Sequence, residues 1–171
     1  MKHDPQAVQT TLPSPLGNIL IAASAQGLIG LWFHDQKHLP SREERARWLV
    51  QADHPVLQAT AEQLDAYFRG TRKVFDLPLD LKHGTPFQQS VWQALCTIGP
   101  GHTGSYGELA RRIGKPQAVR AVGAAVGRNP VSLVVPCHRV VGAQGALTGY
   151  AGGLDRKAAL LRLEASGQTL F

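Results

Sequence analysis

The residues with the clearest capacity for chemistry stand together in the run Pro136-Cys137-His138-Arg139. A cysteine reacts as its thiolate, and neighbouring cationic groups favour that form. His138 is a candidate base for the Cys137 thiol, either directly or through a water molecule. The apolar residues 131–135 precede this run, so the sequence predicts a strand that delivers a nucleophilic cysteine with its base beside it.

A carboxylate could complete this set. Glu164 lies on a predicted amphipathic helix over about 154–165, where it can orient and polarise His138. A carboxylate that is simply solvated on the helix surface is the alternative. The Cys-His pair alone is weak evidence for a hydrolase, because peptidases usually take these two residues from distant segments.

The second cysteine, Cys96, lies on a predicted helix over 86–98 with helically spaced apolar residues. We expect Cys96 to be a small core residue rather than a reactive one. Two cysteines do not make a disulfide scaffold in a cytosolic chain, and the seven histidines show no paired Cys/His ligand spacing. We therefore expect no structural metal and no organic cofactor.

Two short helices are predicted before the reactive run. Ser105 can cap a helix over 106–113, with Glu108 at the position that closes a capping box. The turn 114–116 separates it from a second helix over about 117–127. Two short helices joined by a turn that contains glycine are typical of a helix-turn-helix.

The second helix is unusual for a protein that reads bases. Its polar residues are Gln117 and Arg120, and its other residues, such as Ala121, are small or apolar. Major-groove readers usually present several Arg, Asn or Gln side chains. A helix with small side chains can instead approach a narrow groove closely, and one arginine can insert as a wedge into the base stack. The alternative is a core helix whose small residues permit close packing.

The net charge of +6 lies entirely in the C-terminal half. Residues 1–84 carry nine basic and nine acidic residues, whereas residues 85–171 carry nine basic and three acidic ones. Such an excess attracts a polyanion, although a solvated basic surface that maintains solubility is the alternative. The charge changes where Thr85 and Pro86 can begin a helix, so we predict domains over 1–84 and 85–171.

The N-terminal half predicts a hairpin from strands over 17–24 and 28–33. It also predicts a helix that Ser41 caps, with Glu44 placed to complete a capping box, and a second helix over about 55–69 that Gly70 ends. The expected fold class is α/β (α+β) with two domains. The first is a mixed α/β domain with a small antiparallel sheet. The second is a mostly helical, winged-helix-like domain with the helix-turn-helix. No stretch approaches the roughly 20 apolar residues of a membrane span, and we expect a cytoplasmic, nucleoid-associated protein of bacterial type.

Several motifs in one order resemble the O6-alkylguanine-DNA alkyltransferase family. Residues 136–140 (Pro-Cys-His-Arg-Val) resemble its active-site signature. The runs 105–106, 120–123, 129–130 and 149–153 fit the same family at the same relative spacing. The resemblance is strong over about residues 85–167, and in the N-terminal half it extends only to length and general character.

The resemblance implies a role for each matching residue. Cys137 would accept the alkyl group, and His138 and Glu164 would activate it through a bridging water. Asn129 would hold the turn between the recognition helix and the active-site strand. Tyr106 would press on the flipped base and its 3′ phosphate and help to donate a proton to the leaving guanine.

The resemblance also implies a DNA-binding face and a pocket. Arg120 would fill the space left by the flipped nucleotide, and the DNA-binding set is completed by Tyr106, Gln117, Ala121 and Arg128. The backbone of Val140 and the segment Tyr150-Ala151 would frame the base in a pocket that includes Pro136. Two departures concern substrate range: Ala151 stands where some members carry serine, and Ser132 where some carry a proline that lines the alkyl pocket.

The implied activity is a single, irreversible transfer of an alkyl group from O6-alkylguanine in double-stranded DNA to Cys137. The base would flip out through the minor groove, largely independently of sequence. We expect a monomer, and leave open cooperative binding and activity on O4-alkylthymine. Two alternatives remain: a non-catalytic helix-turn-helix protein that binds alkylated DNA or regulates genes, and a cysteine hydrolase that uses Cys137 and His138.

Overall fold

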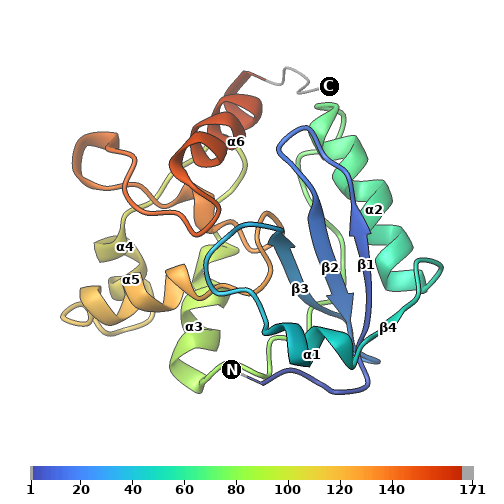
Figure 1. The fold of residues 1–171 in the computed structure, drawn as a ribbon. Coiled ribbons are helices and arrows are strands. Elements are labelled where there is room, and N and C mark those ends of the chain that lie inside the picture. The colour runs from blue at the N-terminus through green and yellow to red at the C-terminus, as the bar shows by residue number, and fades with distance from the viewer. Residues whose placement is uncertain (1, 167–171) are drawn as a thin grey trace.

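The computed structural model describes residues 2–166, so residues 1 and 167–171 of the two predicted domains lie outside the described part. A small sheet from the N-terminal half lies between helix α2 and the helices of the C-terminal half (Figure 1). The mixed α/β fold class is confirmed. In residues 2–166, no helix is both long enough and apolar enough to cross a bilayer.

The sheet has four strands in the order β3-β2-β1-β4. Strands β1 (Val8–Leu12), β2 (Ile19–Ala23) and β3 (Leu28–Phe33) form an antiparallel meander, and β4 (Leu49–Val50) pairs in parallel with β1. The predicted hairpin of β2 and β3 is confirmed, whereas β1 and β4 were not predicted. Every residue of β2 and β3 is buried, which explains their continuous apolar sequence.

The two faces of the sheet enter two different cores. Alternate residues of β2 and β3, such as Ile21 and Phe33, contribute to the larger core, which extends through both halves of the chain. The intervening residues, such as Leu20 and Trp32, contribute to a smaller core with Trp48. The ring planes of Trp32 and Trp48 are stacked there at a centroid distance of 6.2 Å.

Two helices belong to the N-terminal half. In α1 (Arg42–Ala46), the Ser41 hydroxyl accepts from the Glu44 amide at 3.1 Å, as predicted. The reciprocal half of the expected capping box is absent, because the Glu44 carboxylate instead accepts from the backbone N–H of His3 at 2.7 Å. Helix α2 (Pro55–Phe68) follows the predicted bounds and ends just before Gly70, whose φ is +78°.

The C-terminal half contains helices α3 (Pro86–Leu95), α4 (Tyr106–Arg112), α5 (Val119–Gly127) and α6 (Leu154–Ser166). Two short 3₁₀ helices, η1 (Cys137–Arg139) and η2 (Ala143–Gly145), lie before α6. The capping box predicted at the start of α4 is formed, and Thr85 caps α3 as predicted, in a capping box with Gln88 that was not predicted. Cys96 is exposed, so its expected place in the core is wrong: the residue is the C-cap, where α3 ends.

Helices α4 and α5 form the predicted helix-turn-helix and pack against α3. The indole N–H of Trp92 on α3 donates to the carbonyl of Ala125 on α5 at 2.8 Å, within the core. Helix α5 begins at Val119, later than predicted, so Gln117 lies in the preceding turn.

The edge strand β3 connects the two halves. Leu31 donates from its amide to the carbonyl of Pro130 at 2.8 Å, and accepts from the amide of Ser132 at 3.1 Å. A strand edge that is left open exposes unpaired backbone groups, and here the segment 130–132 covers part of that edge. The sheet of the N-terminal half therefore positions the segment that leads to Cys137.

Candidate active site

A closed turn precedes the reactive cysteine. The predicted strand over 131–135 is wrong, because the chain folds back on itself with an amide-to-carbonyl bond from Val135 to Val131 at 2.9 Å. Leu133 takes a left-handed conformation at φ +72°, which a β-strand cannot contain. Its buried apolar side chain and the pairing of Val131 with Leu31 hold this conformation in place.

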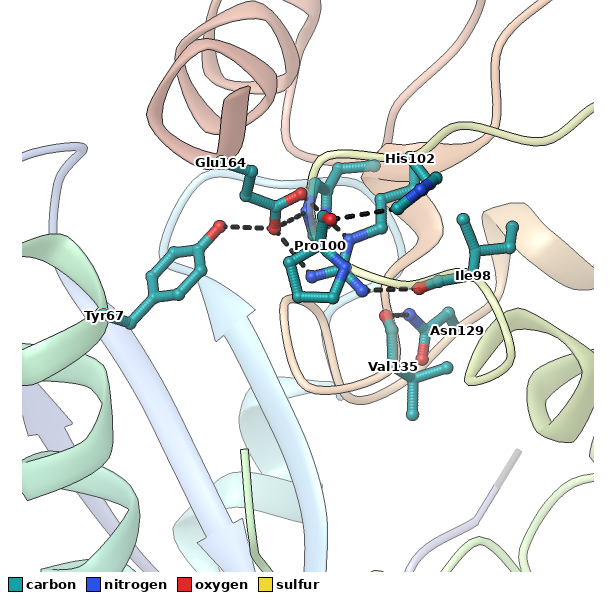
Figure 2. A network of polar contacts seen from close by, with 9 residues as sticks. Tyr67, Ile98, Pro100, His102, Asn129, Val135 and Glu164 are labelled. Atoms are coloured by element: carbon teal, nitrogen blue, oxygen red, sulfur yellow. Dashed lines mark hydrogen bonds and ion pairs between the residues drawn. The ribbon is translucent and has the colours of Figure 1, made fainter. Parts of the chain in front are cut away.

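Asn129 holds both ends of this turn. Its side-chain N–H donates to the carbonyl of Val135 at 2.7 Å, and its side-chain oxygen accepts from the amide of Val131 at 2.9 Å. Figure 2 shows the bond to Val135. Asn129 is buried, so these two bonds satisfy backbone groups that have no access to water. The side-chain amide of Asn129 therefore stabilises the turn that positions Cys137.

Cys137 begins the 3₁₀ helix η1 and is 6% exposed. Burial raises the pKa of the Cys137 thiol, because a thiolate is poorly solvated there. Hydrogen bonding from Asn129, the positive charge of Lys157 and nearby backbone amides act in the opposite direction. The resting sulfur is therefore a thiol, surrounded by groups that stabilise the thiolate once a proton leaves.

His138 and Glu164 form a fully enclosed pair. The Nε2 atom of His138 lies 2.7 Å from Oε1 of Glu164, and both side chains are buried. Burial lowers the pKa of His138 despite the neighbouring carboxylate, so the ring is neutral. An ionised carboxylate only accepts, which places the ring proton on Nε2 and a free lone pair on Nδ1. Nδ1 has no protein partner among residues 2–166, and it is the basic atom of this ring.

Glu164 receives donors from three residues of two elements, η1 and α2. Besides His138, Arg139 donates from Nε to Oε2 and from Nη2 to Oε1, both at 2.9 Å, and the hydroxyl of Tyr67 donates to Oε1 at 2.8 Å. Figure 2 shows Tyr67 and Glu164 pointing toward each other from different helices. Burial raises the pKa of Glu164, but the bonds from His138 and Arg139 outweigh it and lower that pKa to about 2.

Arg139 does not act on the sulfur as the sequence suggested. Its guanidinium is occupied by Glu164 and by the carbonyl of Ile98, which accepts from Nη1 at 2.6 Å. The cation that favours the thiolate of Cys137 is instead Lys157, which sequence reasoning missed. Lys157 shares one stripe of α6 with Leu160 and Glu164, and this spacing is the signal that could have revealed it.

Lys157 also organises the loop before α6. Its buried ammonium donates to the carbonyls of Val140, Thr148 (2.7 Å) and Gly149 (3.3 Å). Three carbonyl oxygens satisfy the three donors of an ammonium group. The loop that carries Tyr150 and Ala151 is therefore fixed by the same charge that faces Cys137.

A cavity of about 220 Å³ opens onto the sulfur. Of the residues expected around the base, four line this cavity: Cys137, Tyr106, Tyr150 and Ala151. The other three, Ser132, Pro136 and Val140, are buried and are not among its lining residues. The hydroxyl of Tyr150 is buried without a protein partner in the described part of the chain. Lys37 and His38 also line the cavity, and no pattern in the sequence indicated them.

Comparison with known proteins agrees with this geometry. A family model for the DNA-binding domain of 6-O-methylguanine DNA methyltransferase matches residues 86–166, and a model for its ribonuclease-like domain matches residues 7–81. The methylated-DNA–protein-cysteine methyltransferase of Mycobacterium tuberculosis is 49% identical over 156 residues, which covers 91% of each chain. The chain belongs to the 6-O-methylguanine DNA methyltransferase family.

Other members of this methyltransferase family are similar over the same length. The methylated-DNA–protein-cysteine methyltransferase of Methanosarcina barkeri is 47% identical over 157 residues, which covers 90% of this chain and 94% of the relative. The crystal structure of Mycobacterium tuberculosis OGT in complex with DNA matches with a TM-score of 0.83 at 47% identity, and covers 93% of each chain. The suspected family is thereby confirmed.

Helix α5 of this methyltransferase family member has two different faces. Val122, Ala125 and Val126 are buried against its neighbours, so part of the core-helix alternative is correct. The other face is exposed and carries Arg120 and Ala121. Gln117, in the turn before the helix, and Arg128, directly after it, are exposed as well. The exposed face is therefore small-sided, with single basic side chains.

Proposed function

We propose that this protein repairs DNA directly, by moving an alkyl group from O6 of a guanine in duplex DNA onto Sγ of Cys137. The observation that carries the proposal is the position of the Cys137 thiol in a cavity beside a neutral histidine that is bound to an ionised carboxylate. These residues are of the types that serve as a nucleophile, a base and an orienting group, and the base contacts the orienting group. Membership of the methyltransferase family supports the same chemistry.

Activation begins at the sulfur. The proton of Cys137 passes to Nδ1 of His138, directly or through a water, and the imidazolium that forms is stabilised by Glu164 at 2.7 Å. Lys157 and Asn129 stabilise the thiolate at the same moment. Burial disfavours both the thiolate of Cys137 and the imidazolium of His138 in the free protein. The proton is therefore transferred when the substrate binds.

The transfer is a single displacement. The thiolate attacks the alkyl carbon, a C–S bond forms, and the bond between that carbon and O6 breaks. The electron pair of the broken bond passes to the guanine, and the Tyr106 hydroxyl supplies a proton to it. Tyr106 lines the same cavity as Cys137, which supports this role.

The base must leave the duplex first, because a stacked base cannot reach a buried sulfur. Arg120 fills the space in the stack, and the small exposed side chains of α5, such as Ala121, allow close approach to the minor groove. Gln117 and Arg128 contact the backbone beside it, so affinity depends little on sequence. This arrangement supports an alkylated guanine in double-stranded DNA as the partner.

Each molecule reacts once. The product is a thioether, and the proposed site offers no second nucleophile to break it. A cysteine hydrolase would instead release its product and react again, and it would have no use for Arg120 on an exposed, small-sided helix.

The test is mass spectrometry of the intact protein and its peptides after mixing with a duplex that carries one O6-methylguanine. The expected result is one methyl group on the peptide that contains Cys137, never more than one per protein, and none in Cys137→Ser. Repeated turnover on excess duplex would contradict the single-use mechanism. A tight complex without any mass gain would favour a protein that only binds the lesion.

A further inference from the structure

The cavity above Cys137 has a wall from the N-terminal half of the chain. Eight of its ten lining residues lie between positions 106 and 151, and the other two are Lys37 and His38. Both are exposed, and both belong to the loop that leaves β3 toward α1. Their side chains thus lie at the entrance by which a base would reach the sulfur.

Hydrogen bonds and an ion pair hold the loop of residues 34–38 at this entrance. The amide of Lys37 donates to the carbonyl of Ala151 at 3.1 Å, which joins it to the segment expected to frame the base. The buried side chain of Gln36 accepts from the amide of Phe33 at 2.9 Å. Asp35 is ion-paired to Arg156 at 2.6 Å. The position of Lys37 is therefore fixed from both halves.

The backbone of this loop carries a further constraint. His38 has a φ of +64°, in the left-handed region that side chains other than glycine rarely adopt. Such conformations persist where the surrounding structure imposes them, and they gather at functional sites. Here the conformation turns the chain immediately after Lys37, so that both side chains face the cavity.

Among the described residues that line this cavity, the one charged side chain is that of Lys37. Burial lowers the pKa of His38, and the neighbouring charges of Arg128 and Lys37 lower it further. Among residues 2–166, neither Lys37 nor Arg128 has an ion-pair partner, and no acidic residue lines the cavity. A positive charge without a counter-ion attracts an anion.

We propose that Lys37 binds a phosphate of the lesion strand beside the flipped guanine, so that the N-terminal half completes the DNA-binding site. The inference rests on the proposed function, which brings a flipped nucleotide to this entrance. The base enters the cavity while its phosphates stay at the rim, where a lysine held between Ala151 and His38 meets them. A point charge on a flexible stem suits one phosphate and reads no base.

The experiment measures binding without reaction. In the Cys137→Ser background, the affinity for a duplex with one O6-methylguanine is measured at several KCl concentrations, for the parent and for K37A, K37R and K73A. Each phosphate contact contributes about 0.9 to the slope of log affinity against log salt. K37A is expected to lose about one unit of slope and roughly fivefold in affinity at about 0.1 M salt, and K37R is expected to keep the slope.

K73A is the matched control, because Lys73 is also exposed and lies outside the lining of this cavity. It is expected to keep the slope of the parent. Equal slopes for K37A and K73A would overturn the inference, as would a parent protein that does not bind the duplex. Methyl transfer by the wild-type protein is followed separately by mass. The salt slopes therefore test the role of Lys37, and the mass measurement tests the proposed function. A negative result in the slopes leaves methyl transfer to Cys137 unaffected.

Discussion

The hydroxyl of Tyr67 donates to Oε1 of Glu164 at 2.8 Å, although 97 positions separate the two residues. Tyr67 lies on α2 in the N-terminal half, and Glu164 lies on α6 near the end of the described chain. The same carboxylate oxygen accepts from His138. The base for Cys137 is therefore oriented by a carboxylate that both halves of the chain hold.

Tyr67→Phe should weaken this connection without opening a cavity. A buried hydrogen bond to a charged group contributes about 1.5–3 kcal/mol, so we expect the free energy of unfolding to fall by roughly that amount. Urea denaturation measures the loss, and the single-turnover rate should fall several-fold as Glu164 orients His138 less firmly. A variant with unchanged unfolding and unchanged rate would show that the bond contributes to neither.

Glu164→Gln should damage stability and alter its pH dependence. Removing the carboxylate leaves Arg139 buried without its partner, which costs about 3 kcal/mol or more. The pKa of Glu164 is lowered to about 2 in the folded protein, so its contribution is complete above the unfolded pKa of about 4.5. That contribution is lost as the pH falls from about 4.5 toward 2.

Acid titration of stability distinguishes this effect from a general weakening. Glu164→Gln should show a flatter pH profile than the wild type in that window, together with a transfer rate lower by about 100-fold or more. Glu62→Gln, an exposed carboxylate on α2, is the control and should keep the wild-type profile. Parallel profiles for wild type and Glu164→Gln would be the contradictory result.

Asn129→Ala should loosen the turn before Cys137. The change leaves the amide of Val131 and the carbonyl of Val135 without side-chain partners in the interior, which costs about 1–3 kcal/mol for each. The thiol pKa should rise as well, since Asn129 stabilises the thiolate. Thermal unfolding and the pH dependence of methyl transfer measure the two effects. Asn18→Ala, at an exposed position, should change neither.

Arg120→Ala should matter for duplex DNA more than for single strands. The residue offsets a flipping cost of a few kcal/mol, so the rate on a lesion duplex should fall about 10- to 100-fold. A single-stranded oligonucleotide needs little flipping, and its rate should change much less. Arg47→Ala removes another exposed positive charge, from the N-terminal half, and should leave both rates unchanged. An equal loss on both substrates would assign Arg120 to simple charge attraction.

Local patterns predicted most of the helices. Caps at Ser41, Thr85 and Ser105 involve neighbours three residues away, so the sequence alone could place them, and all three are formed. Strands β1 and β4 could not be found in this way. Strand β1 is only partly buried and forms because it pairs with β2. Strand β4 is exposed and only two residues long.

The active site shows a similar division. Cys137 and His138 are adjacent, and the proposed link from His138 to Glu164 agrees with the structure. Tyr67, Lys37 and the partner of Arg139 depend on contacts between distant segments, which periodicity does not encode. The strand expected over 131–135 was wrong for the same reason: an apolar run has no period, and the side-chain bonds of Asn129 decided its shape.

The pairing of β3 with residues 130–132 also bears on self-association. The strand reads Leu-Ile-Gly-Leu-Trp-Phe, and a sequence so apolar and uncharged on an open sheet edge is a template for aggregation. In this protein the edge is covered by Leu79 and by the segment that leads to the nucleophile. The segment that leads to the reactive cysteine therefore also hinders the pairing of this edge with the sheet of another molecule.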